Sequence, residues 1–241
     1  IRIAALCNNA KWDEHSKFRK NRDGTPNFAS PQPYVEELVM GDGSIEKRVM
    51  WKPLGDASES ALLKFVQTYF DIDVYRRDHP KLKEIPFNSS NKYQVSIHQQ
   101  ANEKEHLLVM KGAPERILRR CDTILMNGKE EPFTTERQAA IEQIQLDLSR
   151  KGLRVLGFAE RILDPAIYNN DYVYNTEVPN FPLGDDRESF PPEKPHTEAV
   201  FTKLCFVGMM AMIDPPRPQV PPAGERCKRA GIRVIMVTGD H

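Results

Sequence analysis

The chain has 241 residues, of which 39% are hydrophobic and 28% are charged, a composition typical of a water-soluble globular protein with a core. Lysine plus arginine number 34 and aspartate plus glutamate also number 34, so the formal net charge is zero. That balance argues against a protein that binds nucleic acid or another polyanion over its whole surface. The length allows one large domain, or one domain and part of another.

The longest apolar run, residues 204–213, is too short to cross a bilayer as a helix, because a spanning helix needs about 20 residues. The four cysteines do not stand at zinc-site spacings, so we expect reduced thiols in a cytosolic compartment. The chain does not begin with methionine, and it ends with TGDH directly after the apolar run VIMV. We therefore expect a soluble piece of a longer chain.

The first strong helix signal lies at residues 56–70, DASESALLKFVQTYF, after an irregular stretch, 26–53, that contains short strand-like runs. Asp56 has the character of an N-cap and Glu59 occupies the third helical position, which is the spacing of a capping box. The expected buried stripe is apolar at helical spacing and consists of Ala61, Leu62, Phe65, Val66 and Tyr69.

Two strands follow, at residues 92–98 and 105–110, and the polar stretch between them predicts an antiparallel hairpin. A turn at Gly112 then leads into a helix that begins with Pro114. A long amphipathic helix is expected over 134–153, with a buried side made of Ala139, Ile141, Ile144, Leu146 and Leu148.

A further strand starts at Arg154, a proline-rich loop is expected over 169–202, and 204–213 is predicted to be a buried strand. The proline-rich linker DPPRPQVPP then precedes a helix and a continuous apolar strand of the parallel-sheet type. The change of character at Asp214 predicts two domains, residues 1–213 and 214–241.

The candidate site begins with the strand at 92–98, whose alternation places Lys92 and Gln94 on one face and Tyr93, Val95 and Ile97 on the other. If the second strand pairs with it, Lys111 falls near the polar face, and Phe87 could supply a stacking surface. In the alternative reading, Phe87 belongs to the core and the lysines are solvated. No phosphate-cradling glycine loop, GxxxxGK[ST] or GxGxxG, is present.

Other candidates also have a structural alternative. Lys111 and Gly112 could form a ligand-approach turn or a plain strand-to-helix turn, and Glu59 could simply close the capping box. Arg154 could be a strand-edge charge. Thr238 and Asp240, in VTGD, follow a strand of the kind whose carboxyl end binds ligands in α/β sheets, or they form an ordinary turn.

Five motifs together resemble P-type cation-transporting ATPases, most closely the alpha subunits of sodium/potassium and proton/potassium pumps. They are GDASESALL, PFNSSNKYQVSIH, KGAPERIL, MIDPPRP and GIRVIMVTGDH. KGAPE, DPPR and TGD are widespread in the family, whereas FNSSNKYQ with GDASESALL points to the sodium/potassium group. The resemblance covers nearly the whole chain.

The resemblance implies an α+β fold: an antiparallel sheet flanked by helices, the nucleotide-binding (N) domain, followed by the start of an α/β phosphorylation (P) domain. It implies that Phe87 stacks on adenine and that Glu59 and Gln94 contact the adenine. It further implies a pocket lined by Lys92 and Lys111, with a backbone wall at Gly112 and Ala113 and with Arg154 towards the phosphates. Asp214 and Arg217 would lie in the hinge, and Thr238 and Asp240 at the catalytic face of the P domain.

The expected cofactors are ATP and, for the full-length parent, magnesium. The expected partners are ATP, the remaining P, A and transmembrane domains of the same polypeptide, and a beta subunit. The domain itself is expected at the cytoplasmic face of a plasma membrane. The family's DKTGT motif, which carries the phosphorylated aspartate, is absent, so this chain is expected to bind ATP without hydrolysing it. The alternatives are a calcium or proton/potassium pump domain, or a non-catalytic nucleotide-binding module.

Overall fold

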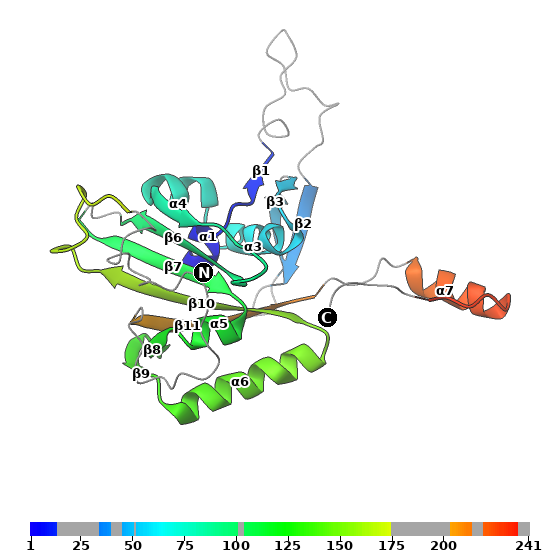
Figure 1. The fold of residues 1–241 in the computed structure, drawn as a ribbon. Coiled ribbons are helices and arrows are strands. Elements are labelled where there is room, and N and C mark those ends of the chain that lie inside the picture. Colours follow the sequence, from blue (N-terminus) through cyan, green and yellow to red (C-terminus); the bar gives the residue numbers. More distant parts are fainter. Residues whose placement is uncertain are drawn as a thin grey trace, which may run out of the picture.

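The computed structural model describes residues 1–13, 34–39, 45–50, 52–100, 104–174, 203–213 and 219–235. Their centre is a seven-stranded sheet of order β5-β6-β7-β10-β11-β8-β9 (Figure 1). All neighbouring strands are antiparallel except β11 and β8, which are parallel. The strands are β5 (Lys81–Ile85), β6 (Tyr93–Gln99), β7 (His106–Gly112), β8 (Cys121–Met126), β9 (Lys129–Pro132), β10 (Arg154–Leu163) and β11 (Leu204–Met212).

Two small antiparallel sheets accompany the large one. They pair β1 (Lys11–Trp12) with β4 (Pro53–Leu54), and β2 (Tyr34–Val39) with β3 (Ile45–Met50). The short strands expected within residues 26–53 are therefore confirmed.

Helices cover both faces of the large sheet (Figure 1). The upper face in this view carries α1 (Arg2–Leu6), α3 (Ala57–Gln67) and α4 (Ile72–Asp78), and the lower face carries α5 (Pro114–Leu118) and α6 (Thr135–Arg150). The remaining helix is α7 (Val220–Arg229). The α+β architecture with an antiparallel sheet between helices is thus confirmed. Among the described residues, no helix combines the length and the apolar character that crossing a membrane requires.

The strand alternation builds a separate core on each face of the sheet. Val95 and Ile97 of β6 join Ile117 of α5 in the lower core, as the pattern predicts. In the upper core, Leu107 and Val109 of β7 join the buried residues of α1 and α3. The predicted hairpin is confirmed, since β6 pairs with β7 from Tyr93 opposite Gly112 to Gln99 opposite His106.

The N-terminal segment packs into the upper core. Ile3 and Leu6 of α1 are buried, and Arg2 forms an ion pair with Glu160 of β10 in which Arg2 Nε donates to Glu160 Oε2 at 2.6 Å. Sequence periodicity missed this five-residue helix because it is shorter than two turns. The packing nevertheless fixes residues 1–13 against the face that carries the candidate site.

The helix predicted over residues 56–70 is confirmed as α3, but its buried side differs from the predicted stripe. Leu62, Leu63 and Val66 are buried, whereas Phe65 and Tyr69 are exposed and contact each other edge to face at 5.3 Å. Helical spacing gives the apolar side only to within one residue, and α1 and α4 decide which part of it is covered.

The helix predicted over residues 134–153 is confirmed as α6, but its predicted buried side is wrong. No residue of α6 is fully buried; Ile144 and Leu146 are exposed, and Ile141 is partly buried against the lower core. The pattern identifies an apolar side, but the extent of burial depends on what lies opposite.

The C-terminal region confirms the predicted helix as α7. The described start of the predicted parallel strand, residues 231–235, is exposed and not in a strand. A strand of that kind needs parallel neighbours to bury both of its faces. Residues 214–218 and 236–241, which include the expected hinge and the TGD motif, lie outside the described part of the chain.

Candidate nucleotide-binding site

The first turn of α3 places Glu59 beside the sheet. The side chain of Asp56 accepts hydrogen bonds from the backbone N–H groups of Ser58 and Glu59, at 2.8 and 3.0 Å. Asp56 is therefore the N-cap that the sequence predicts. This cap fixes where the helix begins and hence where the Glu59 carboxylate lies.

Strand register brings two more candidates to the same place. Gln94 of β6 lies opposite Lys111 of β7, and Lys111 lies opposite Phe158 of β10. Residues that lie opposite each other in an antiparallel pair share a face of the sheet. The structure thus confirms the expectation that Lys111 falls on the polar face of the first strand.

Glu59 and Lys111 form a largely buried ion pair beneath α3. Lys111 Nζ donates to Glu59 Oε1 at 2.5 Å, and the two side chains are only 8% and 12% exposed, respectively. The second oxygen, Oε2, accepts from the backbone N–H of Asn9 at 3.1 Å. The carboxylate therefore reaches the sheet and the N-terminal segment, and the reading of Glu59 as a simple capping-box residue is wrong.

Gln94 is 1% exposed, and its amide has a fixed orientation. Nε2 donates to Glu84 Oε1 at 2.9 Å, and an ionised carboxylate can only accept. Burial raises the pKa of Glu84, but hydrogen bonds from Lys81, Asn9 and Gln94 outweigh it and leave the pKa below its usual value. Gln94 Oε1 is left buried without a hydrogen-bond partner in the described part of the chain.

Phe87 precedes β6 and is 60% exposed, so the alternative that assigned it to the core is wrong. Lys92 is also exposed, but it is not part of the strand. Its φ of 59° places it in the left-handed region, in a turn that ends where β6 begins at Tyr93. The predicted strand, 92–98, therefore begins and ends one residue earlier than β6, and Lys92 does not share a sheet face with Gln94.

Gly112 and Ala113 end β7 close to the start of β6. The N–H of Ala113 donates to the carbonyl of Lys92 at 2.9 Å. A Cβ atom on Gly112 would lie 2.7 Å from Tyr93 Cα and closer still to the Lys92 carbonyl oxygen. The glycine is thus required by the approach of the neighbouring strand, a reason that does not depend on a ligand.

Replacing Gly112 by alanine is expected to lower the free energy of unfolding by about 1–3 kcal/mol, because two backbones must separate. Urea unfolding followed by circular dichroism measures this. Gly224→Ala on α7 is the matched control, since a Cβ there meets nothing within 4 Å. Equal stability of the two variants would contradict the close approach of β6 and β7.

Arg154 begins β10 near the start of α3. Its Nη1 donates to Ser58 Oγ at 2.9 Å, and the side chain is exposed. The interaction places a cation beside the residue that precedes Glu59, at the same end of the sheet as Lys111. Arg154 is therefore both a strand-edge charge and a neighbour of the candidate site.

The rest of the polar face of β6 is internal. Ser96 and His98 are buried; Ser96 Oγ lies 3.5 Å from the carbonyl of Leu6 and 2.9 Å from His98 Nε2, and His98 Nδ1 lies 3.0 Å from the carbonyl of His79. The polar face of β6 therefore does not continue as a pocket past Gln94, at Ser96 and His98. Residues with polar side chains alternate here because they bond to backbone carbonyls and to each other.

His98 makes stability depend on pH. Nδ1 must donate to the His79 carbonyl, so Nε2 of the neutral ring accepts from Ser96. Burial lowers the pKa of His98 from 6.5 to about 4, with further lowering by Lys81, His79 and Arg76 and opposition from the His79 carbonyl. The unfolded state therefore binds the proton at higher pH than the folded state.

The contribution of neutral His98 to the free energy of unfolding is expected to be fully present above pH 6.5. It should be lost as the pH drops towards 4, and the loss should reach about 3 kcal/mol. Urea unfolding at several pH values measures the loss. His98→Gln should flatten the profile within this window, and an unchanged slope in that variant would assign the acid sensitivity to other groups.

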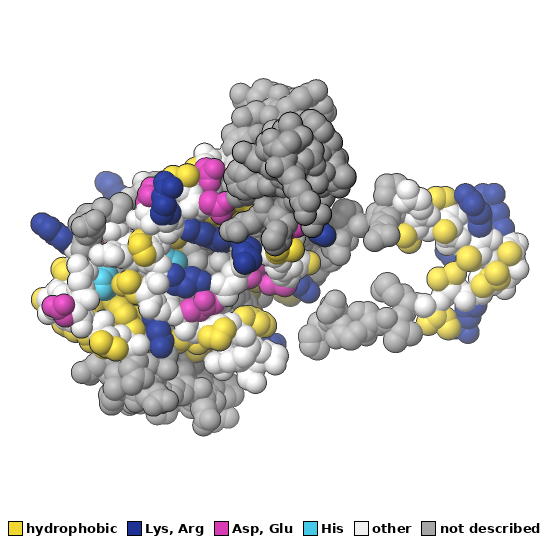
Figure 2. Space-filling model, turned by 90° about the horizontal axis from the view of Figure 1, so that it is seen from above, with side chains coloured by type: hydrophobic (Ala, Val, Ile, Leu, Met, Phe, Trp, Pro, Cys, Tyr) yellow, Lys and Arg dark blue, Asp and Glu magenta, His cyan; other side chains and the backbone are white. Residues whose placement is uncertain are grey.

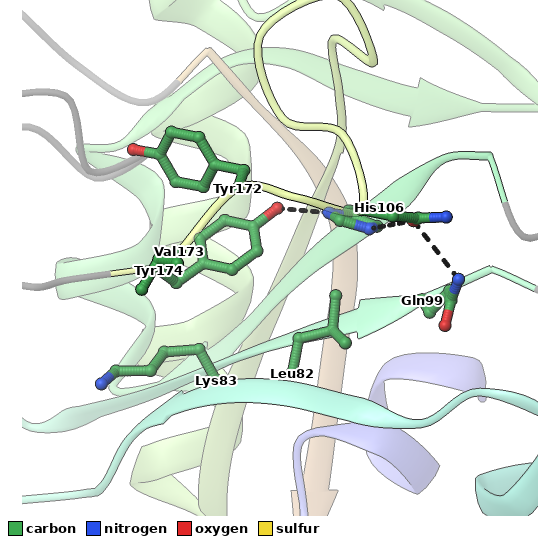
Figure 3. Close-up of a pocket in the computed structure, with 8 residues that line it drawn as sticks. Leu82, Lys83, Gln99, His106, Tyr172, Val173 and Tyr174 are labelled. Atoms are coloured by element: carbon green, nitrogen blue, oxygen red, sulfur yellow. Dashed lines mark hydrogen bonds between the residues drawn. The ribbon is translucent and has the colours of Figure 1, made fainter.

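A pocket lies at the opposite end of β6 and β7 and on the other face (Figure 3). It has a volume of about 460 Å³ and includes Leu82, Gln99 and His106 in its lining. Its polar groups bond to one another: His106 lies between Tyr174 Oη at 2.6 Å and Asn170 Oδ1 at 3.1 Å. This pocket contains none of the candidate residues.

The four remaining candidates, Asp214, Arg217, Thr238 and Asp240, lie outside the described residues. Within the described part of the chain, no three His, Cys, Asp or Glu side chains gather as a metal site would require.

Sequence reasoning missed Asn9 and Glu84, which bond to Glu59 and Gln94, respectively. Glu84 stands three residues before Phe87, on an edge strand whose residues lack clear alternation. Asn9 lies in a loop. Neither position had a spacing signal, because both reach the site through tertiary packing. Seen from above, the described surface of the molecule carries Lys and Arg side chains interspersed with Asp and Glu (Figure 2).

The sequence was compared with those of known proteins and protein families. The profile described as P-type ATPase, cytoplasmic domain N, matches residues 36–219. The whole chain is 44% identical to the sodium/potassium-transporting ATPase subunit alpha of Tetronarce californica and 46% identical to the alpha-2 subunit of Gallus gallus. It is 42% identical to the human alpha-4 subunit. In each case it spans 19% of the length of the relative. The chain belongs to the P-type ATPases, as a cytoplasmic domain N similar to that of sodium/potassium-transporting ATPase alpha subunits.

Proposed function

We propose that the chain binds ATP at the end of the sheet where Glu59, Gln94 and Lys111 meet, and that it presents the nucleotide to an aspartate outside this sequence, which accepts the terminal phosphoryl group. The parent protein would be an ATP-driven cation pump of the sodium/potassium-exchanging type. The observation that carries the proposal is the convergence of these three side chains at one end of the sheet, with the exposed ring of Phe87 on the segment that leads into β6.

Each residue has a role suited to its chemistry. Phe87 offers an exposed aromatic face for adenine. Gln94 Oε1 has no hydrogen-bond partner among the described residues, and the exocyclic amine of adenine is a donor. Lys111 and the exposed Lys92 supply positive charge beside the backbone of Gly112 and Ala113, and Arg154 extends it towards the phosphates.

The other domains and the magnesium ion that the reaction needs would be supplied by the longer parent protein. Residues 1–213 would form the nucleotide-binding domain and 214–241 the hinge and the start of the phosphorylation domain. Asp214 and Arg217 would lie in that hinge, with Thr238 and Asp240 at the catalytic face. Magnesium would arrive with the nucleotide and the other domains, and a beta subunit would accompany the parent. The nucleotide-binding domain would lie at the cytoplasmic face of the plasma membrane.

Isothermal titration of the 241-residue chain with ATP tests the proposal. We expect a dissociation constant on the order of 1 mM, about −4 kcal/mol, because stacking and a few charges act without the phosphate contacts of a second domain. No phosphate should be released, since the DKTGT nucleophile is absent. Turnover that co-purifies with the chain would contradict the binding-only role, and no saturable binding at 20-fold the expected constant would reject the ATP site.

A further inference from the structure

Loop 8–10, the segment after α1, contacts Glu59 from two sides. The backbone N–H of Asn9 donates to Glu59 Oε2 at 3.1 Å. Asn8 Nδ2 donates to the backbone carbonyl of Glu59 at 3.0 Å, while Asn8 Oδ1 accepts from the N–H of Ala10 at 2.8 Å. The loop therefore fixes both the carboxylate and the backbone of Glu59.

The same loop also contacts the polar group that orients Gln94. Asn9 Nδ2 donates to Glu84 Oε1, and Asn9 Oδ1 accepts from Lys81 Nζ at 2.8 Å. Since Glu84 Oε1 also accepts from Gln94, a single loop supports two of the three side chains of the candidate site. Its own position then decides the geometry of that site.

The guanidinium group of Arg76, near the end of α4, donates hydrogen bonds to two backbone carbonyl groups of this loop and to one of α1. Nε donates to the carbonyl of Ala5 at 2.9 Å, Nη2 to that of Asn8 at 2.8 Å, and Nη1 to that of Ala10 at 2.7 Å. The guanidinium group has a rigid planar arrangement of donors, so three simultaneous bonds fix the path of the loop. The side chain is only partly buried, so its removal leaves no large cavity.

We propose that Arg76 is a positioning residue for nucleotide binding: it holds loop 8–10 so that Asn9 fixes the carboxylate of Glu59 and, through it, the ammonium group of Lys111. The proposal rests on the proposed ATP site, but its structural part concerns the free protein. Arg76 itself does not bond to Glu59 or Lys111 in the structure; it acts through three backbone carbonyls.

The first test needs no nucleotide. In Arg76→Ala, the amide proton of Asn9 is expected to move upfield in a ¹H–¹⁵N NMR spectrum, because its hydrogen bond to the Glu59 carboxylate is lost. Arg76→Lys should give an intermediate shift, since an ammonium group cannot keep all three bonds in one plane. An Asn9 amide that stays in place in Arg76→Ala overturns the proposal.

The second test is a double-mutant cycle on ATP affinity. We expect Arg76→Ala to weaken binding about tenfold in the otherwise unchanged chain and by less than about twofold when Glu59 is already glutamine, because the two changes act on one contact. Equal effects in both backgrounds would show a merely structural role and overturn the proposal.

Arg2→Met is the matched control, because Arg2 anchors the same N-terminal segment at its other end, on Glu160. It is expected to leave the Asn9 amide and the ATP affinity unchanged within about twofold, and an equal loss in this variant would point to general loosening and overturn the role of Arg76. If the unchanged chain fails to bind ATP, the proposed function fails, while the Asn9 amide still decides whether Arg76 fixes the loop.

Discussion

Replacing Lys111 by methionine is expected to lower the free energy of unfolding by about 3–5 kcal/mol, because it leaves the Glu59 carboxylate buried without its cation. Both side chains of the pair are little exposed, at 8% and 12%, so solvent screens the interaction only weakly. The same change should abolish measurable ATP binding. Urea unfolding measures the first effect and titration calorimetry the second.

Two comparisons sharpen this experiment. Adding Glu59→Gln to Lys111→Met should recover part of the lost stability, since the unpaired charge is removed. Arg150→Met breaks an exposed pair with Asp147 on α6 and should change stability by less than about 1 kcal/mol. If Lys111→Met is no more harmful than Arg150→Met, the buried pair does not exist in solution.

The second large effect separates the core from the site. Ile97→Ala is expected to cost about 2–5 kcal/mol of stability, because Ile97 is 1% exposed in the lower core and its loss leaves a cavity. Phe87→Ala should hardly affect stability, since the ring is 60% exposed. It should instead weaken ATP binding roughly ten- to a hundredfold through the lost stacking contact.

Thermal unfolding and ATP titration of both variants check this pair of expectations. The expected pattern is a lowered melting temperature with retained affinity for Ile97→Ala, measured where that variant is folded, and the reverse for Phe87→Ala. A Phe87→Ala protein that melts early but binds ATP normally would show that the ring serves the fold, and the adenine contact would then lie elsewhere.

The parts of the fold that sequence predicts are those with a regular local pattern. The Asp56 cap and the alternation of Val95 and Ile97 predict α3 and β6 because capping and side-chain period act within a few residues. The short polar stretch predicts the hairpin but not its register, and it is the structure that places Gln94 opposite Lys111. Local rules therefore predict these elements but not which of their residues lie opposite each other.

The parts that sequence does not predict depend on distant packing. Ser96 and His98 continue the polar alternation of Gln94, yet Ser96 donates to His98 Nε2 and His98 Nδ1 donates to the carbonyl of His79. Nothing near position 76 marks it as the residue that holds loop 8–10. Polar alternation alone cannot distinguish a ligand from the backbone of another element as the partner.

Mapping the ATP contact by ¹H–¹⁵N NMR tests the central claim most directly. With increasing ATP, saturable shifts are expected at the backbone amides of Gln94, Lys111 and Gly112, with no comparable shifts at Gln99 and His106, which line the pocket at the far end of the same strands. Shifts concentrated at Gln99 and His106, with the amides at Gln94 and Lys111 unmoved, would contradict the account.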